Sequence, residues 1–319
     1  MNQVTLTHGY EALRTTAAWF DLSARGRLRA TGTDRKRLLH ALTTNHVEGL
    51  QPGQGVYAFF LNAQGRVLAD AIIACRAEDL LISTEPETRE KVAQHIERYI
   101  IADDVTLGDA TAATCELALE GPDADSRLVF MDLPVPGAEY ASAEAGAVTI
   151  LRASVTGQTG FRLIAPAERK DQLRSTLAEF APQAEAEDVR TIRLENGRPR
   201  YGEDISERYI AHETARLDAL HFDKGCYLGQ EIVERVRSRG LVHRQLRALR
   251  IEGHALPATG EKILAGEKEV GEITSAAFSP AERAVRALAY LRLDAGQSPG
   301  LRTAGGQAAQ IVEHRRRHR

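Results

Sequence analysis

Length, composition and charge exclude several classes of protein. With 319 residues the chain is too long for one average hydrophobic core, so two or three subdomains are expected. A net charge of −3 gives no basis for nucleic-acid binding by the whole chain, and no apolar run of about 18 residues is present that would span a membrane.

The cysteines and the first residues indicate a reducing compartment. Cys75, Cys115 and Cys226 are odd in number and widely spaced, which argues against a disulfide framework. Residues 1–10 lack the charged-then-apolar pattern of a signal peptide. We therefore expect a cytoplasmic protein that needs no membrane.

Strand and helix patterns alternate over the first 110 residues. Leu38, Leu39 and Leu42 recur at helical spacing, and Pro86 opens a second helical pattern. The predicted strands are 27–31, 56–61, 66–75 and 80–83, and the predicted helices are 33–42 and 86–99. We expect a first α+β subdomain over 1–110, with helices on an antiparallel or mixed sheet.

The pattern partly repeats over residues 111–240, which predict a second α+β subdomain with strands at 115–119, 148–155 and 161–164 and helices at 121–128, 167–180 and 188–194. After Gly240, short strands separated by glycine and proline predict a small antiparallel β-barrel over 241–319. The barrel ends in a basic tail, 314–319, which is either a solvated terminus or a contact for a polyanion.

The segment 224–231, Lys-Gly-Cys-Tyr-Leu-Gly-Gln-Glu, is the most informative stretch of the chain. Glycines on both sides of Cys226 predict a tight, exposed turn that presents the sulfur. Lys224 would favour the thiolate, which is the reactive form. The alternative is a small buried cysteine in a turn, but the neighbouring residues favour the functional interpretation.

Glu195 lies where a carboxylate is unfavourable. It falls in the last turn of a helix that Gly197 ends, at the negative end of the helix dipole. Such a carboxylate can take two hydrogen bonds from an amidine-like face, such as that of a 2-amino-4-oxopyrimidine ring. The alternative is a salt bridge to Arg193, Arg198 or Arg200.

Asp70 alternates with apolar residues on a strand that is otherwise suited to burial. A buried carboxylate must be paired, solvated or functional. The alternative is that Asp70 faces water on the polar side of a half-covered sheet.

Several segments together resemble one known family. Residues 222–231 resemble the signature of the YgfZ folate-binding proteins, a branch of the glycine cleavage T-protein superfamily. The resemblance covers nearly the whole chain. Its further landmarks are Gly32-Thr33-Asp34, Phe60-Leu61-Asn62 with Gly65-Arg66, Thr159-Gly160-Phe161, Arg193-Leu194-Glu195, Tyr201-Gly202 and Gly271-Glu272-Ile273-Thr274-Ser275.

The resemblance implies three subdomains around a central cavity for tetrahydrofolate or one of its one-carbon derivatives, closed by the C-terminal barrel. It implies that Glu195 holds the pterin and that Asp70, Cys226 and Lys224 are catalytic. The folate's acidic tail is expected near basic residues such as Arg239 or Arg244. Asn62, Tyr227 and Gln230 complete the expected cofactor-binding set.

Two functions follow from the resemblance. The YgfZ branch implies a role in iron–sulfur cluster assembly or repair, with assembly proteins or client enzymes as partners and tRNA modification as a downstream effect. The T-protein branch implies an aminomethyltransferase, which passes an aminomethyl group from a lipoyl carrier to folate and releases ammonia. Cys226 favours the first function and Asp70 the second.

We predict no metal site, since His212, His221 and His243 match no compact ligand motif.

Overall fold

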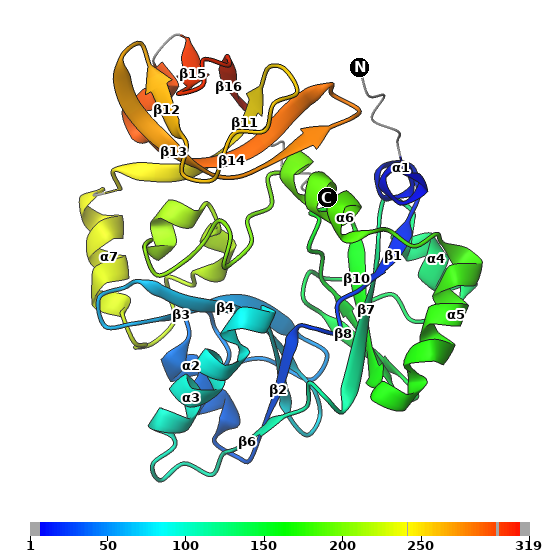
Figure 1. Cartoon of the computed structure of the whole chain (residues 1–319). Coiled ribbons are helices and arrows are strands. Elements are labelled where there is room, and N and C mark those ends of the chain that lie inside the picture. Colours follow the sequence, from blue (N-terminus) through cyan, green and yellow to red (C-terminus); the bar gives the residue numbers. More distant parts are fainter. Residues whose placement is uncertain (1–6, 241, 298–299, 313–319) are drawn as a thin grey trace.

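The computed structural model describes residues 7–240, 242–297 and 300–312, which form three antiparallel sheets with helices packed against them (Figure 1). The α+β class predicted from the sequence is confirmed. The basic tail at 314–319 lies outside the described residues. None of the described helices is both long enough and apolar enough to cross a membrane.

The first sheet has the strand order β3-β4-β5-β2-β6. Its strands are β2 (Gly26–Thr31), β3 (Gly55–Leu61), β4 (Val67–Cys75), β5 (Leu80–Thr84) and β6 (Thr106–Asp109). The helices α2 (Arg35–Leu42) and α3 (Arg89–Tyr99), with the short η1 (Pro86–Thr88) between β5 and α3, cover one face. Leu39 and Ile96 of these helices pack on Ile73 and Ile82 of the sheet, so one face of the sheet forms a closed core.

The second sheet has the order β1-β7-β10-β9-β8. Its strands are β1 (Ala18–Asp21), β7 (Thr114–Glu120), β8 (Ser142–Ala145), β9 (Val148–Arg152) and β10 (Gly160–Pro166). Its helical segments are α1 (His8–Thr15), α4 (Ala124–Phe130), η2 (Ala167–Arg169), α5 (Lys170–Phe180) and α6 (Ala186–Glu195). Although α1 and β1 precede the first sheet in the chain, β1 pairs with β7. The domain boundaries at 110 and 240 remain predictions.

The third sheet has the order β15-β12-β13-β14-β11-β16 and curls into a half-barrel at one end of the molecule (Figure 1). Its strands are β11 (Arg244–Ile251), β12 (Lys262–Ala265), β13 (Lys268–Ser279), β14 (Ala284–Arg292), β15 (Leu301–Thr303) and β16 (Ala309–Val312). The turn η5 (Leu293–Gln297) follows β14. The segment that leads into this sheet contains η3 (Ala211–Thr214), η4 (Leu217–Ala219) and α7 (Gln230–Arg239).

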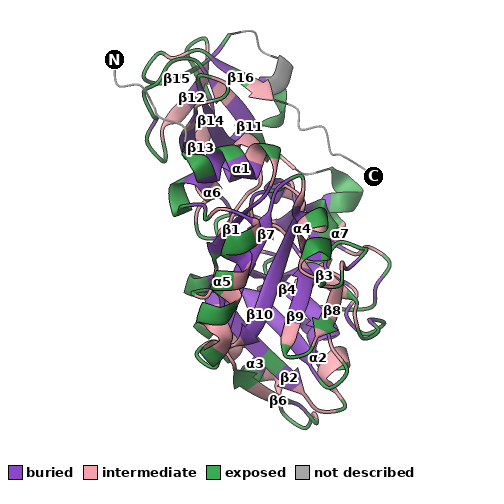
Figure 2. Cartoon of the chain, turned by 90° about the vertical axis from the view of Figure 1, so that its right-hand side faces the viewer, coloured by how far each residue is buried: buried purple, intermediate pink, exposed green. Residues whose placement is uncertain are grey.

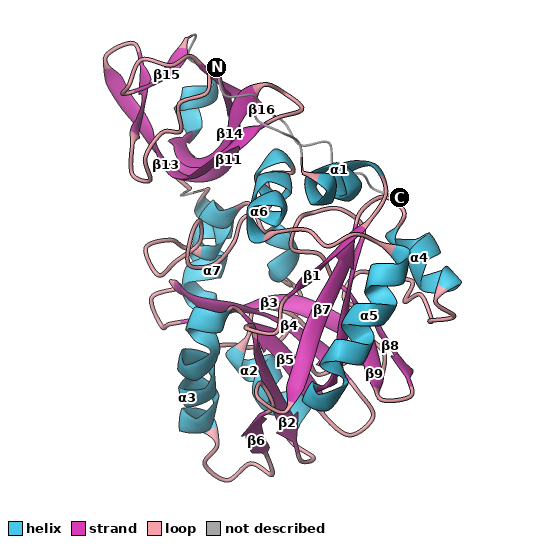
Figure 3. Ribbon diagram, turned by 45° about the vertical axis from the view of Figure 1, so that its right-hand side comes forward, coloured by secondary structure: helices cyan, strands magenta, loops and turns pink. Residues whose placement is uncertain are grey.

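The first two sheets face one another across a buried layer that is continuous through the lower part of the molecule (Figures 2 and 3). Tyr57 and Ile72 of the first sheet pack in one apolar cluster with Leu151 and Ile164 of the second. Charged side chains are buried in the same layer, among them Arg27, which is fully buried. Buried charges must be paired, and several of the charged residues in this layer line the cavity described next.

Candidate functional site

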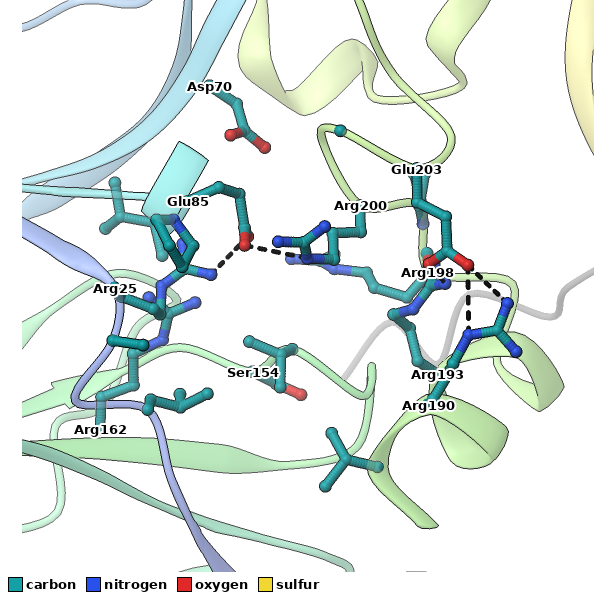
Figure 4. A pocket seen from close by; sticks show the side chains of 18 of the residues that line it. Arg25, Asp70, Glu85, Ser154, Arg162, Arg190, Arg193, Arg198, Arg200 and Glu203 are labelled. Carbon is teal, nitrogen blue, oxygen red and sulfur yellow. Dashed lines mark hydrogen bonds and ion pairs between the residues drawn. The ribbon is translucent and has the colours of Figure 1, made fainter. Parts of the chain in front are cut away.

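A cavity of about 570 Å³ lies between the first sheet, the second sheet and the segment that follows α6 (Figure 4). Pockets of this size accommodate small molecules or cofactors. Charged side chains dominate its polar wall: Asp21, Arg25, Asp70, Glu85, Arg162, Arg190, Arg193, Arg198, Arg200, Glu203 and Arg216. Of the residues predicted from the sequence to be catalytic or to bind the cofactor, only Asp70 lines this cavity.

Asp70 is one of three charged residues in a row on the cavity wall. β5 ends at Thr84, and its pairing with β2 and β4 places the next residue on each strand, Arg25, Glu85 and Asp70, side by side. Neighbouring strands bring such side chains within about 5 Å of each other. The sheet therefore puts two carboxylates next to each other, with an arginine on one flank.

The two carboxylates of this row have opposite electrostatic environments. Burial by itself raises the pKa of Glu85, but the charges of Arg25 and Arg200 outweigh it and hold that pKa below its ordinary value. Arg25 donates to Glu85, and Arg200 Nε lies 3.0 Å from the other carboxylate oxygen. Glu85 is therefore the ionised member of the pair.

Asp70 is the member whose pKa is raised. Burial raises its pKa, and the negative charge of Glu85 raises that pKa further. Tyr57 Oη donates to Asp70 Oδ2 at 2.7 Å, whereas Oδ1 has no hydrogen-bond partner among the described residues. Neighbouring acids whose pKa values are pushed apart are typical of proton-transfer sites. Oδ1 is thus a buried oxygen without a hydrogen-bond partner among the described residues, on a residue of the cavity wall.

Glu195 lies outside the cavity lining. Its Oε1 accepts hydrogen bonds from Tyr10 and Ser279, each at 2.5 Å, and its Oε2 accepts from Arg14 at 2.6 Å. The carboxylate thus joins α1, α6 and the end of β13. Both oxygens therefore take part in hydrogen bonds within the protein, and the pterin contact expected from the sequence stays a prediction. The salt-bridge alternative was right in kind, but its partner is Arg14, 181 positions away in the chain.

The segment 224–231 forms a surface structure apart from the cavity. Cys226 is exposed, as the flanking glycines predict. Lys224 is buried and donates to the carbonyls of His40, in the last turn of α2, and of Thr43 and Asn45, just beyond that helix. Burial lowers the pKa of Lys224 to about 7. Its ammonium group therefore anchors the turn to backbone carbonyls instead of pairing with the Cys226 thiol.

Three expected cofactor contacts belong to the same surface structure. Asn62 Oδ1 accepts from the backbone N–H groups of Gln64 and Arg66, each at 3.0 Å, and so closes the β3–β4 hairpin. Tyr227 is buried beneath the Lys224 ammonium, and Gln230 is the first residue of α7. None of the three lines the cavity. A β-carbon at Gly229, whose φ is +83°, would lie 2.7 Å from the Asn62 carbonyl, so the turn packs tightly on the hairpin.

Arg244 lines a separate, more open hollow of about 660 Å³. Its Nε donates to Glu213 at 2.9 Å, and its guanidinium lies over the ring of Tyr209. Arg66 and Arg292 line the same hollow. Among the residues that the structure describes, no group of three or more histidine, cysteine or acidic side chains is arranged to hold a metal ion.

Sequence reasoning missed Tyr57, Arg25, Glu85 and Arg162 of the cavity wall. The only local signal was a charged residue at the boundary of an apolar strand, which applies to Arg25 and Glu85. Surface strands have the same pattern, so the sequence could not separate the two cases. Burial of these residues results from the contact between the two sheets.

Comparisons with known proteins agree over most of the chain. It matches the GCVT N-terminal domain over residues 3–224 and the glycine cleavage T-protein C-terminal barrel domain over residues 244–317. An aminomethyltransferase of Rubrobacter xylanophilus is 32% identical over 291 residues, which cover 88% of this chain and 78% of that protein. A putative chloroplastic transferase of Arabidopsis thaliana is 28% identical over 300 residues, which cover 92% of this chain and 69% of that protein.

A solved structure confirms the predicted three-part fold with its curled C-terminal sheet. The glycine cleavage system aminomethyltransferase T from Bartonella henselae superposes with a TM-score of 0.86 at 21% sequence identity. The match covers 96% of this chain and 87% of that one.

Replacing Asp70 with asparagine is expected to make the free energy of unfolding fall less as the pH rises above the ordinary carboxyl range. The folded-state pKa of Asp70 is raised, so the folded protein keeps this proton where the unfolded chain has released it. The stabilisation is lost as the pH rises through that pKa, and asparagine avoids the loss.

Urea unfolding between about pH 4 and pH 8 measures the difference between Asp70→Asn and the unmodified protein. The exposed Asp171→Asn serves as a control and should show no such pH-dependent difference. If the free energy of unfolding changes equally with pH in Asp70→Asn and in the unmodified protein, the raised pKa of Asp70 is contradicted.

Replacing Glu195 with alanine is expected to lower the free energy of unfolding by about 3 kcal/mol, because Arg14, Tyr10 and Ser279 lose their common acceptor. Ligand affinity should change by less than about twofold, since Glu195 does not line the cavity. Unfolding and ligand titration of Glu195→Ala beside Glu195→Gln test both statements. A large loss of ligand affinity in a stable variant would support the prediction that Glu195 holds the pterin.

Proposed function

The chain belongs to the glycine cleavage T-protein family, and we propose that it is a tetrahydrofolate-dependent one-carbon transferase of the aminomethyltransferase type. The observation that carries this proposal is Asp70, a buried carboxyl with a raised pKa and one open oxygen on the wall of a ligand-sized cavity. The relatives named aminomethyltransferase, which share up to 32% of their residues with most of this chain, support it.

The residues of the cavity fit a reduced folate. Three buried polar atoms of cavity residues have no hydrogen-bond partner among the described residues: Asp70 Oδ1, Arg25 Nε and Arg162 Nε. When bound, tetrahydrofolate supplies the nitrogen atoms that take up a one-carbon unit. A ligand with both N–H groups and oxygen acceptors can satisfy these positions.

The protein's own contribution centres on one proton. Tyr57 fixes the orientation of the Asp70 carboxyl through Oδ2, which leaves Oδ1 to give or take a proton at the reacting nitrogen. Glu85 keeps the pKa of Asp70 raised, toward the operating pH at which a general acid or base is most effective.

Cys226 supports a second candidate function, a YgfZ-like role in iron–sulfur cluster assembly or repair. The thiol is exposed on a turn that Lys224 ties to three carbonyls and that Gly229 packs against the β3–β4 hairpin. A cysteine held rigidly at the surface, apart from the folate cavity, is suited to contact with a partner protein. The two functions use different parts of the chain, so each can be tested without disturbing the other.

Replacing Asp70 with asparagine is expected to slow ammonia release from an aminomethylated lipoyl carrier and tetrahydrofolate by about 100-fold or more, because the proton-exchanging group is lost. Tetrahydrofolate affinity should fall by no more than about threefold. The exposed Asp171→Asn is the matched control. If the unmodified protein releases no ammonia, it is not an aminomethyltransferase, and if Asp70→Asn stays active, Asp70 is not the proton-transfer group.

Replacing Cys226 with serine is expected to abolish rescue of iron–sulfur enzyme activity in cells that lack this protein. Because the thiol lies outside the cavity, tetrahydrofolate affinity and ammonia release should stay within about twofold of the unmodified values. Asp223→Asn, an exposed change in the same turn, should leave the rescue intact. Full rescue by Cys226→Ser would remove the thiol from the proposal.

A further inference from the structure

Arg216 is a buried cation of the cavity wall that contacts the ring of Tyr57. It is 6% exposed, and its guanidinium carbon lies 3.7 Å from the centre of that ring. A guanidinium group this close to an aromatic face is attracted to it, most strongly where water is kept away. The Tyr57 hydroxyl donates to Asp70 Oδ2, so Arg216 touches the side chain that orients the Asp70 carboxyl.

The guanidinium group of Arg216 is fixed by its own acceptors. Its Nε and Nη2 donate to the two oxygens of Asp218 at 2.9 and 2.8 Å, and Nη2 also donates to Tyr140 Oη at 3.0 Å. Burial lowers the pKa of Arg216, but Tyr57, Tyr140 and Asp218 outweigh it and raise that pKa well above its ordinary value. Neither Asp218 nor Tyr140 lines the cavity. Arg216 is therefore a fixed positive charge that residues outside the cavity lining hold in place.

The backbone is strained at two residues that place this group. Ala215, which directly precedes Arg216, has φ +59°, and Tyr140 has φ +64°. Residues other than glycine rarely adopt positive φ, and such strain persists only where the surrounding structure holds it, often at functional sites. Strain at both residues indicates that the position of the Arg216 guanidinium serves more than packing.

Arg216 opposes the groups that favour a proton on Asp70. Burial raises the pKa of Asp70, and the charge of Glu85 raises it further, whereas the Tyr57 hydrogen bond and the charges of Arg25 and Arg216 lower it. The charged and titratable groups that act on Asp70 are Tyr57 on β3, Glu85 after β5, Arg25 before β2, Tyr201 after α6 and Arg216 before η4, and Arg198 acts on Tyr57. Arg25 is paired with Glu85, whereas Arg216 is stacked on Tyr57.

We propose that Arg216 is a positioning residue for the Asp70 carboxyl: it holds the Tyr57 phenol in the orientation that donates to Oδ2 and adds a fixed positive charge beside it. This inference rests on the proposed one-carbon function for the reaction that Asp70 serves. Arg216 keeps Asp70 able to release its proton, against burial and Glu85, which favour its retention. A group that both gives and takes a proton needs this balance near the operating pH.

Carboxyl NMR of the protein labelled with ¹³C-aspartate, assigned with Asp70→Asn, follows the titration of Asp70 directly. Arg216→Gln is expected to move its midpoint to higher pH, because a positive charge is lost and the phenol is no longer held. Tyr57→Phe keeps the ring and removes the hydroxyl, so it should move the midpoint in the same direction. In the Tyr57→Phe background, Arg216→Gln should cause less than about half of the shift that it causes alone.

Two further variants and an assay complete the test. Arg216→Lys keeps the charge without the planar fork and should recover part of the shift. The exposed Arg98→Gln, on α3, removes the same charge and should leave the midpoint unchanged. In the ammonia-release assay, Arg216→Gln should move the pH–rate profile with the midpoint and lower kcat at pH 7 by about tenfold or more. Tetrahydrofolate affinity should stay within about threefold.

The outcomes separate this inference from the proposed function. An unchanged Asp70 midpoint in Arg216→Gln would overturn it, as would equal shifts with and without the Tyr57 hydroxyl. If Arg216→Gln does not fold, Tyr140→Phe, which removes one acceptor of Arg216, takes its place and should move the midpoint in the same direction. A loss of tetrahydrofolate affinity with an unmoved midpoint would make Arg216 a ligand contact instead. If the unmodified protein releases no ammonia, the proposed function fails, while the NMR titration still tests Arg216.

Discussion

The buried carboxylate of Glu85 sets the electrostatics of the cavity. It lies in one row with Arg25 and Asp70 at the ends of three neighbouring strands, and Arg200 reaches it from the segment that follows α6. The charges of Arg25 and Arg200 hold the pKa of Glu85 below its ordinary value. Burial raises the pKa of Asp70, and the negative charge of Glu85 raises it further.

These electrostatic effects separate the roles of the charged residues around the cavity. Glu85 lines the cavity, and its charge adds to the effect of burial in raising the pKa of Asp70. Arg162 belongs to the opposite sheet, where it donates to Ser83 and lies 3.4 Å from Glu116.

Outside the cavity, the segment 224–231 is organised by different forces. Lys224 anchors it through backbone carbonyls, and Gly229 allows close packing on the hairpin that Asn62 closes. The tight packing explains the composition of the segment without reference to folate. Cys226 is exposed and makes no hydrogen bond among the described contacts. A transferase cavity and a surface thiol can thus coexist on one scaffold without sharing residues.

Sequence alone determined the α+β class and the C-terminal sheet through local periodicity, and the exposed turn at Cys226 through the placement of glycines. It also singled out Asp70, as a charged residue within an apolar strand. It could not place Glu195, whose partner Arg14 is 181 positions away. Nor could it find the row of Arg25, Glu85 and Asp70, because the register between strands and the packing of the two sheets decide which charged side chains meet. The identity of a buried charge's partner is a property of the tertiary structure, since each partner comes from a different part of the chain.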